Sequence, residues 1–162
     1  MRIFQKSRLV LLPALVALFA LTACGGSDDS TGPGGQRNAP NAITVLADSS
    51  LKSAFTQIGK DFEDQNDGAT VSFTFGSSAD LSQQAVAKDP GDVLATADQQ
   101  SMVAAQSAQL GSPQVFAMKG SNQCQIVTLI QAKNTALSDR FINLVLSQSG
   151  QQILKQAGFQ AP

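Results

Sequence analysis

The chain has 162 residues, of which 43% are hydrophobic and 14% charged, and it contains no His, Tyr or Trp. The absence of His excludes imidazole bases, His metal ligands and Ser-His-Asp triads. Three of the 11 basic residues lie in the first ten positions, and without them 8 basic residues face 12 acidic ones, a net charge of −4. An acidic surface of this kind argues against a nucleic-acid partner.

Residues 1–23 have the layout of a secretory signal peptide. A basic start precedes the apolar run Leu9–Ala20, which Pro13 interrupts and which is shorter than the ~20 residues that span a bilayer. The run ends in Leu21-Thr22-Ala23-Cys24, a sequence that resembles the bacterial lipobox. We therefore predict that Cys24 is lipidated and holds the protein at the outer face of the cytoplasmic membrane. The alternative is an ordinary signal peptide with an incidental cysteine.

Residues 24–42 are rich in Gly, Pro, Ser, Asn and Asp, a composition typical of a flexible linker. The remaining residues, 43–162, are enough for one domain with a single core. If Cys24 is acylated, Cys124 has no disulfide partner within the chain. We interpret Cys124 as a small apolar packing residue.

The apolar, β-branched run 43–47 predicts a buried strand, and the polar residues 48–50 predict a turn that caps a helix. The helix is predicted by apolar residues at helical spacing, and 66–68 ends it. These apolar residues are Leu51, Ala54, Phe55, Ile58 and Phe62. Alternation over 71–75 then predicts a second strand.

The turn 76–78 leads into a second predicted helix that carries Leu81, Ala85 and Val86. A third strand over 92–96, a helix over 99–109 and an extended piece over 115–118 follow.

The last elements are a strand over 125–129, a helix that starts near Thr135, and a short helix. Ser149 and Gln152 fit the capping box of that short helix. Strands that alternate with helices predict an α/β fold with a mostly parallel sheet flanked by helices.

Two strand ends are rich in serine, and both lead directly into helices: Asp48-Ser49-Ser50 and Gly76-Ser77-Ser78. The carboxyl ends of strands in an open α/β sheet are where ligands bind, and a helix N-terminus attracts anions. A pocket of neutral donors for an oxyanion is one interpretation. Simple N-capping by serine is the other.

Three blocks of sequence resemble the periplasmic molybdate-binding protein family of ABC importers. They are Ile43–Leu51 (ITVLADSSL), Phe75–Leu81 (FGSSADL) and Pro90–Asp98 (PGDVLATAD), and Asn134–Pro162 is similar as well. The resemblance implies one lobe of a type II periplasmic-binding-protein fold. It also implies a monomer that captures molybdate, and usually tungstate, and delivers it to a membrane permease. Ser50 and Ser78 match the serines that contact the anion, with no catalytic residue, cofactor or further metal.

The chain departs from the family pattern at two places. Asp48 stands where the family usually has a small neutral residue, so its carboxylate either points away from a bound dianion or alters the ligand preference. The segment 114–117 resembles the outgoing crossover between the lobes and 125–129 the return, with the second lobe largely absent between them. That lobe holds the family's remaining anion contacts, including a tyrosine.

Three hypotheses follow from these observations. The first is a lipid-anchored, one-lobed oxyanion-binding protein, and the second is a ligand-free remnant that acts only as a surface lipoprotein. The third, a hydrolase or transferase with Ser50 or Ser78 as nucleophile, is disfavoured because the chain has no His to act as base.

Overall fold

The computed structural model describes residues 41–87 and 90–162. The predicted signal peptide and Cys24 lie outside the described residues, as does the linker up to residue 40. The strands are β1 (Ala42–Asp48), β2 (Thr70–Gly76), β3 (Val93–Thr96), β4 (Gln114–Lys119) and β5 (Asn122–Thr128). The helices are α1 (Lys52–Gln65), α2 (Ser78–Val86), α3 (Gln99–Ala104), α4 (Thr135–Leu146) and α5 (Gln148–Gln156), with short 3-10 turns η1 (Ser49–Leu51) and η2 (Gln106–Ala108).

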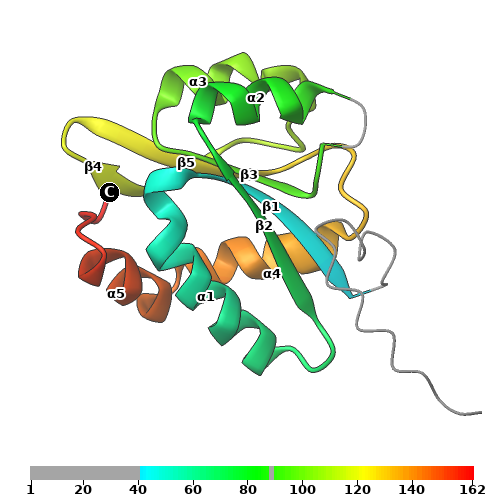
Figure 1. Cartoon of the computed structure of the whole chain (residues 1–162), viewed down its shortest axis with the longest axis vertical. Helices are drawn as coiled ribbons and strands as arrows, with labels where there is room; N and C mark the ends of the chain where they lie inside the picture. Colours follow the sequence, from blue (N-terminus) through cyan, green and yellow to red (C-terminus); the bar gives the residue numbers. More distant parts are fainter. Residues whose placement is uncertain (1–40, 88–89) are drawn as a thin grey trace, which may run out of the picture. The chain divides into compact units, whose positions relative to one another are not determined.

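The five strands form one mixed sheet in the order β2-β1-β3-β5-β4, with helices on both faces (Figure 1). The predicted α/β class is therefore confirmed. Strand β1 pairs in parallel with β2 and β3, which gives the sheet its parallel part. Strand β5 runs antiparallel to both β3 and β4. It is joined to β4 by a hairpin whose turn contains Gly120 at a φ of 61°.

Both faces of the central strand β1 are buried. Ile43 and Val45 point to the face that α1, α4 and α5 cover, whereas Leu46 points to the face that α2 and α3 cover (Figure 1). Successive side chains of a strand alternate between faces, so a strand covered on both sides must be apolar throughout. This explains the unbroken apolar run that predicted the strand.

The predicted apolar face is confirmed, since all five of its residues are buried, four of them in α1 and Leu51 in the turn η1 just before it. Phe55 and Phe62 both contact Phe141 of α4, with ring centroids 5.9 and 5.5 Å apart and the rings edge to face. Such edge-to-face pairs add to the free energy of burial. They lock α1 and α4 against the same face of the sheet.

One helix prediction is confirmed and another needs correction. Helix α2 carries Leu81, Ala85 and Val86 as predicted, with Leu81 and Ala85 buried and Val86, its last residue, 47% exposed. The single helix predicted over 99–109 is in fact the short helix α3 followed by the 3-10 turn η2.

The predicted capping box at Ser149 is wrong. Helix α5 begins at Gln148, and its N-cap is Ser147, whose Oγ accepts the N–H of Gly150 at 3.2 Å. The early start brings the backbone of Gly150 against the end of α4, where a Cβ atom would collide with the carbonyl oxygens of Leu144 and Val145. Packing between the two helices therefore decides where α5 begins.

Candidate oxyanion site

Strands β1 and β2 end side by side, which brings the two serine-rich turns together. The parallel register pairs Asp48 with Gly76, the last residue of each strand. The chain enters η1 and α1 directly after Asp48, and α2 directly after Ser77. The amino ends of two helical segments therefore meet at the carboxyl edge of the sheet, where their N–H groups can bind an anion.

Ser78 lies at the centre of this region and is only 5% exposed. Its backbone N–H and its hydroxyl both donate to Oδ2 of Asp48, at 3.1 and 2.7 Å. The hydroxyl oxygen in turn accepts the N–H of Ala97 at 3.0 Å. These contacts orient the Ser78 hydroxyl so that its proton points at an anionic oxygen.

Ser50 contributes from the opposite side of the same carboxylate. Its backbone N–H donates to Oδ1 of Asp48 at 2.9 Å. Its hydroxyl oxygen is buried and has no partner in hydrogen-bonding geometry among the residues that the structure describes. A buried hydroxyl without a partner costs free energy, so an unpaired one beside a cluster of donors indicates a contact still to be made.

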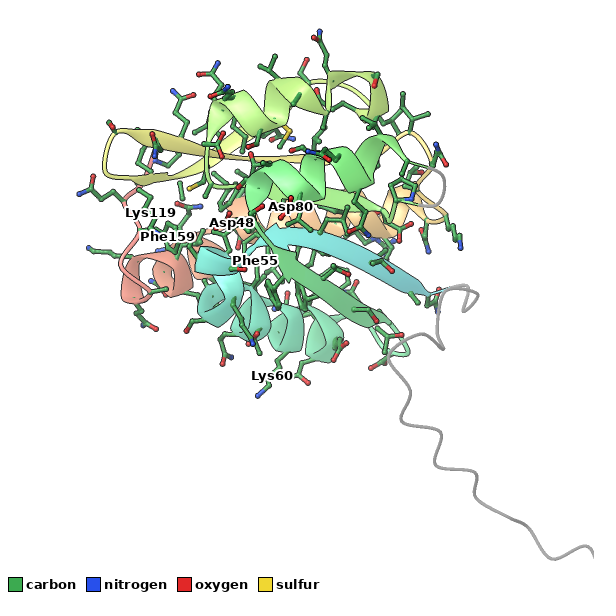
Figure 2. The ribbon with its side chains drawn as sticks, turned by 45° about the horizontal axis from the view of Figure 1, so that its top comes forward. Asp48, Phe55, Lys60, Asp80, Lys119 and Phe159 are labelled. Atoms are coloured by element: carbon green, nitrogen blue, oxygen red, sulfur yellow. The ribbon has the colours of Figure 1, made fainter. Side chains whose placement is uncertain are left out.

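We call the N–H groups and the hydroxyl groups of Ser50 and Ser78 the oxyanion cradle. The structure brings the two predicted site residues together in this cradle, although the anion that they hold is the carboxylate of Asp48. The first of the two expectations for Asp48, that it points away, is wrong. Figure 2 labels Asp48, where β1 ends, and Asp80, in the first turn of α2.

The environment keeps Asp48 ionised. Burial raises the pKa of this carboxyl, but the hydrogen bonds from Ser78 and Ser50 outweigh burial and hold the pKa below its ordinary value. The nearby Ser50 hydroxyl adds to this lowering of the pKa, although it makes no hydrogen bond of good geometry. The cradle therefore stabilises a negative charge.

Strand β3 contributes to the site as well, which was not predicted from the sequence. Its carboxyl end lies beside β1, and the N–H of Ala97, just after that end, fixes the Ser78 hydroxyl. A backbone donor has no side-chain signal, but the rule that ligands meet the carboxyl ends of parallel strands would have included this third strand end.

The remaining serines of the two turns have structural roles. Ser77 is the N-cap of α2, since its Oγ accepts the N–H of Asp80 at 3.1 Å. The hydroxyl of Ser49 donates to the carbonyl of Gly76 and ties the two turns together. Simple capping thus accounts for Ser77, whereas the side chains of Ser50 and Ser78 cap neither helix.

The interpretation of Cys124 as a packing residue agrees with its position in the core, where it pairs with Ala117 across β4 and β5. It is fully buried, and burial, with a smaller contribution from Asp48, raises the pKa of its thiol to about 11. A thiol with so high a pKa is unreactive at neutral pH.

A family profile described as "Bacterial extracellular solute-binding protein" matches residues 43–123, half of the chain. The chain therefore belongs to the bacterial extracellular solute-binding protein family.

Individual relatives are similar in sequence to more than half of this chain. The molybdate-binding proteins ModA of Mycobacterium bovis and Mycobacterium tuberculosis are 37% identical over 108 residues. That match covers 65% of this chain and 41% of each relative, so the chain spans well under half of their length.

Solved structures share the fold at low sequence identity. The periplasmic molybdate-binding protein of Azotobacter vinelandii matches with a TM-score of 0.67 at 14% identity, over 74% of this chain and 99% of the other. A substrate-binding domain of a putative molybdenum ABC transporter from Clostridium difficile gives 0.68 at 12% identity, over 75% and 99%. The sulfate-binding protein SubI of M. tuberculosis gives a TM-score of 0.60 at 12% identity, over 75% of this chain and 87% of the other.

In the part of the chain that the structure describes, no helix has the length and apolar character needed to cross a membrane.

Proposed function

We propose that the oxyanion cradle binds a tetrahedral dianion, molybdate first and tungstate second, and that the protein is the binding component of an ABC importer. The observation that carries this proposal is the convergence of the donors of Ser50 and Ser78 on one ionised carboxylate. A carboxylate is itself an oxyanion, so Asp48 stands in for the ligand oxygens that these donors suit.

The kind of donor supports a preference for fully deprotonated anions. The cradle consists of N–H and O–H groups, which can donate to every oxygen of molybdate or tungstate. Phosphate at neutral pH carries a proton on one oxygen, and that P–OH group would need an acceptor. The 37% identical relatives are named as molybdate-binding proteins, which supports the same choice of ligand.

The ligand-free alternative is less well supported. Those relatives carry names that denote binding, and the buried Ser50 hydroxyl without a partner is suited to a ligand. This site does not support the hypothesis that Ser50 is a nucleophile. A nucleophilic serine needs an adjacent base, and Lys52, the lysine nearest to Ser50 in sequence, lies 5.9 Å over the ring of Phe75.

Calorimetry on the full-length chain in detergent tests the proposal. Molybdate and tungstate should bind more tightly than phosphate at neutral pH, and Ser50→Ala should weaken molybdate binding. Ser49→Ala is the matched control, because that hydroxyl donates to the Gly76 carbonyl and lies outside the cradle. The proposal fails if no tetrahedral oxyanion binds the wild-type chain or its variants, or if phosphate binds more tightly than molybdate.

Delivery to a permease and anchoring through a lipid on Cys24 belong to the same proposal. They rest on the lipobox-like Leu21-Thr22-Ala23-Cys24 and the Gly-rich segment after it. A binding component tethered to the membrane meets its permease at a high effective concentration.

A further inference from the structure

The carboxylate of Asp48 makes more contacts than a capping residue needs. Its Oδ1 accepts the N–H of Ser50 two residues on, as a capping aspartate does at the start of a helix. Its Oδ2 instead reaches Ser78, 30 residues along the chain, and accepts both the N–H and the hydroxyl of that residue.

Helix α2 does not need this second oxygen as a cap. Its own N-cap is Ser77, whose hydroxyl oxygen accepts the N–H of Asp80. The donors that Asp48 takes from Ser78 are therefore the same ones that an incoming oxyanion would use.

We propose that Asp48 is a tethered competitor for the oxyanion cradle and sets the affinity and selectivity of the site. The proposal rests on the function proposed above. An external anion binds only after the carboxylate leaves the donors of Ser50 and Ser78, and the chain without that carboxylate binds oxyanions far more tightly.

Two physical effects allow the Asp48 carboxylate to compete with an external anion. It is covalently attached next to the cradle, so it occupies the donors without the loss of translational freedom that a diffusing anion suffers. Its negative charge also repels a dianion at the same donors, and like charges brought together at a binding site reduce affinity by about 100-fold or more.

The buried Ser50 hydroxyl indicates that Asp48 fills only part of the site, because this donor is left without a partner. The three hydrogen bonds to Asp48 use the other donors of the cradle, and the Ser50 hydroxyl remains without a partner. A tetrahedral anion has four oxygens and can accept from this hydroxyl as well, which a planar carboxylate on a short tether does not do here.

Calorimetry with sodium molybdate and sodium sulfate on the full-length chain at pH 7 tests the proposal. We expect Asp48→Ala to bind molybdate at least about 100-fold more tightly than the wild type. Asp80→Asn is the matched control: it removes one negative charge from the first turn of α2 but leaves Asp48 in the cradle. It should change affinity by no more than a few-fold, as expected for an exposed charge.

A second variant and a second measurement distinguish an effect on binding from an effect of misfolding. Asp48→Asn removes the charge but keeps the size of the side chain, and it should also bind more tightly than the wild type. Amide resonances of Ser50 and Ser78 should shift on addition of molybdate in both Asp48 variants, at concentrations that leave the wild type unchanged.

The outcomes separate the two proposals. Equal affinity of the wild type and both folded Asp48 variants overturns the competitor role and leaves the proposed function standing. Tighter binding in Asp80→Asn of the same size as in Asp48→Ala overturns it too, because general charge would then explain the gain. Absence of binding to every folded variant overturns both.

Discussion

Ser50 and Ser78 share the oxyanion cradle but differ in what the fold requires of them. Ser78 is buried, donates to Asp48 and accepts from Ala97, so the protein depends on its hydroxyl even without a ligand. The hydroxyl of Ser50 has no partner. The two serines therefore allow stability and binding to be measured separately.

We predict that Ser78→Ala lowers the free energy of unfolding by about 1–3 kcal/mol, because it leaves a buried N–H and part of a carboxylate without partners. Ser50→Ala should leave stability nearly unchanged. Ser50→Ala should reduce the free energy of molybdate binding by about 1.5–3 kcal/mol, the usual value for a hydrogen bond to a charged group. Ser78→Ala should reduce it by less, because in the free protein that hydroxyl already donates to Asp48. Urea denaturation and calorimetry give the two quantities, and equal destabilisation by both variants would contradict this difference.

The pH dependence of stability should report on Asp48. Its pKa is lower in the folded protein than in the unfolded chain, where a value of 3.8 is ordinary. The hydrogen-bonded carboxylate therefore stabilises the fold above pH 3.8, and this contribution is lost as the pH falls through the folded pKa.

Wild type and Asp48→Asn should differ most in stability near neutral pH, and the difference should shrink in acid. Urea unfolding from pH 7 down to pH 3 measures it. A difference that stays constant or grows toward acid would show that the carboxylate is not ionised in the cradle.

At the scale of elements, the start of α5 shows how a tertiary contact selects between two candidate capping residues, Ser147 and Ser149. Ser147 caps the helix, and its Oγ also lies 2.9 Å from the Oγ of Ser149. The side chain of Gln151 donates to the carbonyls of Phe116 and Val145, so this helix start is held against both β4 and α4.

We predict that Ser147→Ala destabilises the protein by about 1 kcal/mol, the typical cost of losing an N-cap. The paired substitution Ser149→Ala should cost much less, because that hydroxyl accepts no N–H group at the helix start. Thermal or urea denaturation distinguishes the two. A larger loss for Ser149→Ala would support the capping box that the sequence predicted.

At the scale of the whole molecule, the size of the donor set limits the affinity. The match to the mycobacterial relatives covers 41% of their length, and β4 and β5 meet in a tight hairpin where the sequence predicted the two crossovers between lobes. We propose that this chain offers the donors of one lobe only. An anion held from one side stays open to solvent, where each contact is weaker.

Loss of two or three charge-assisted hydrogen bonds, at ~1.5–3 kcal/mol each, reduces the free energy of binding by about 4–6 kcal/mol. Since 1.4 kcal/mol is tenfold, we predict an affinity for molybdate at least about a thousandfold below that of the mycobacterial relatives. Side-by-side calorimetry measures it. A sub-micromolar dissociation constant for the wild-type monomer, or restored molybdate uptake in a strain without its receptor, would overturn the prediction.

Anchoring is also a property of the whole molecule. We predict that Cys24→Ala moves the protein from the detergent phase to the aqueous phase in a Triton X-114 partition, or blocks its maturation. The reason is that stable anchoring takes two acyl chains, which a diacylated cysteine supplies. Cys124→Ala is the control, because that thiol is buried in the core. Unchanged partitioning of Cys24→Ala would rule out the lipid anchor.

Local sequence patterns determined most of the elements of this protein. The unbroken apolar run of β1, the helical spacing from Leu51 to Phe62 and the serine-rich turns all depend on neighbours in the chain, and the structure contains each of them. The two candidate site serines, Ser50 and Ser78, remain a prediction that comes from the family resemblance. The local pattern predicted the two turns that contain them, and the resemblance singled out these serines within the turns.

Only the tertiary structure decided how these parts meet. The register of β1 against β2 places Asp48 beside Ser78, 30 residues away, so that its carboxylate accepts the donors of the cradle. The sequence left open whether this carboxylate points away from the site or alters its ligand preference. The antiparallel entry of β5 and the cap of α5 likewise depend on contacts between distant segments. A pattern of neighbouring residues reports the conformation of its own segment, whereas the partner of a charged side chain depends on what the fold brings within hydrogen-bonding distance.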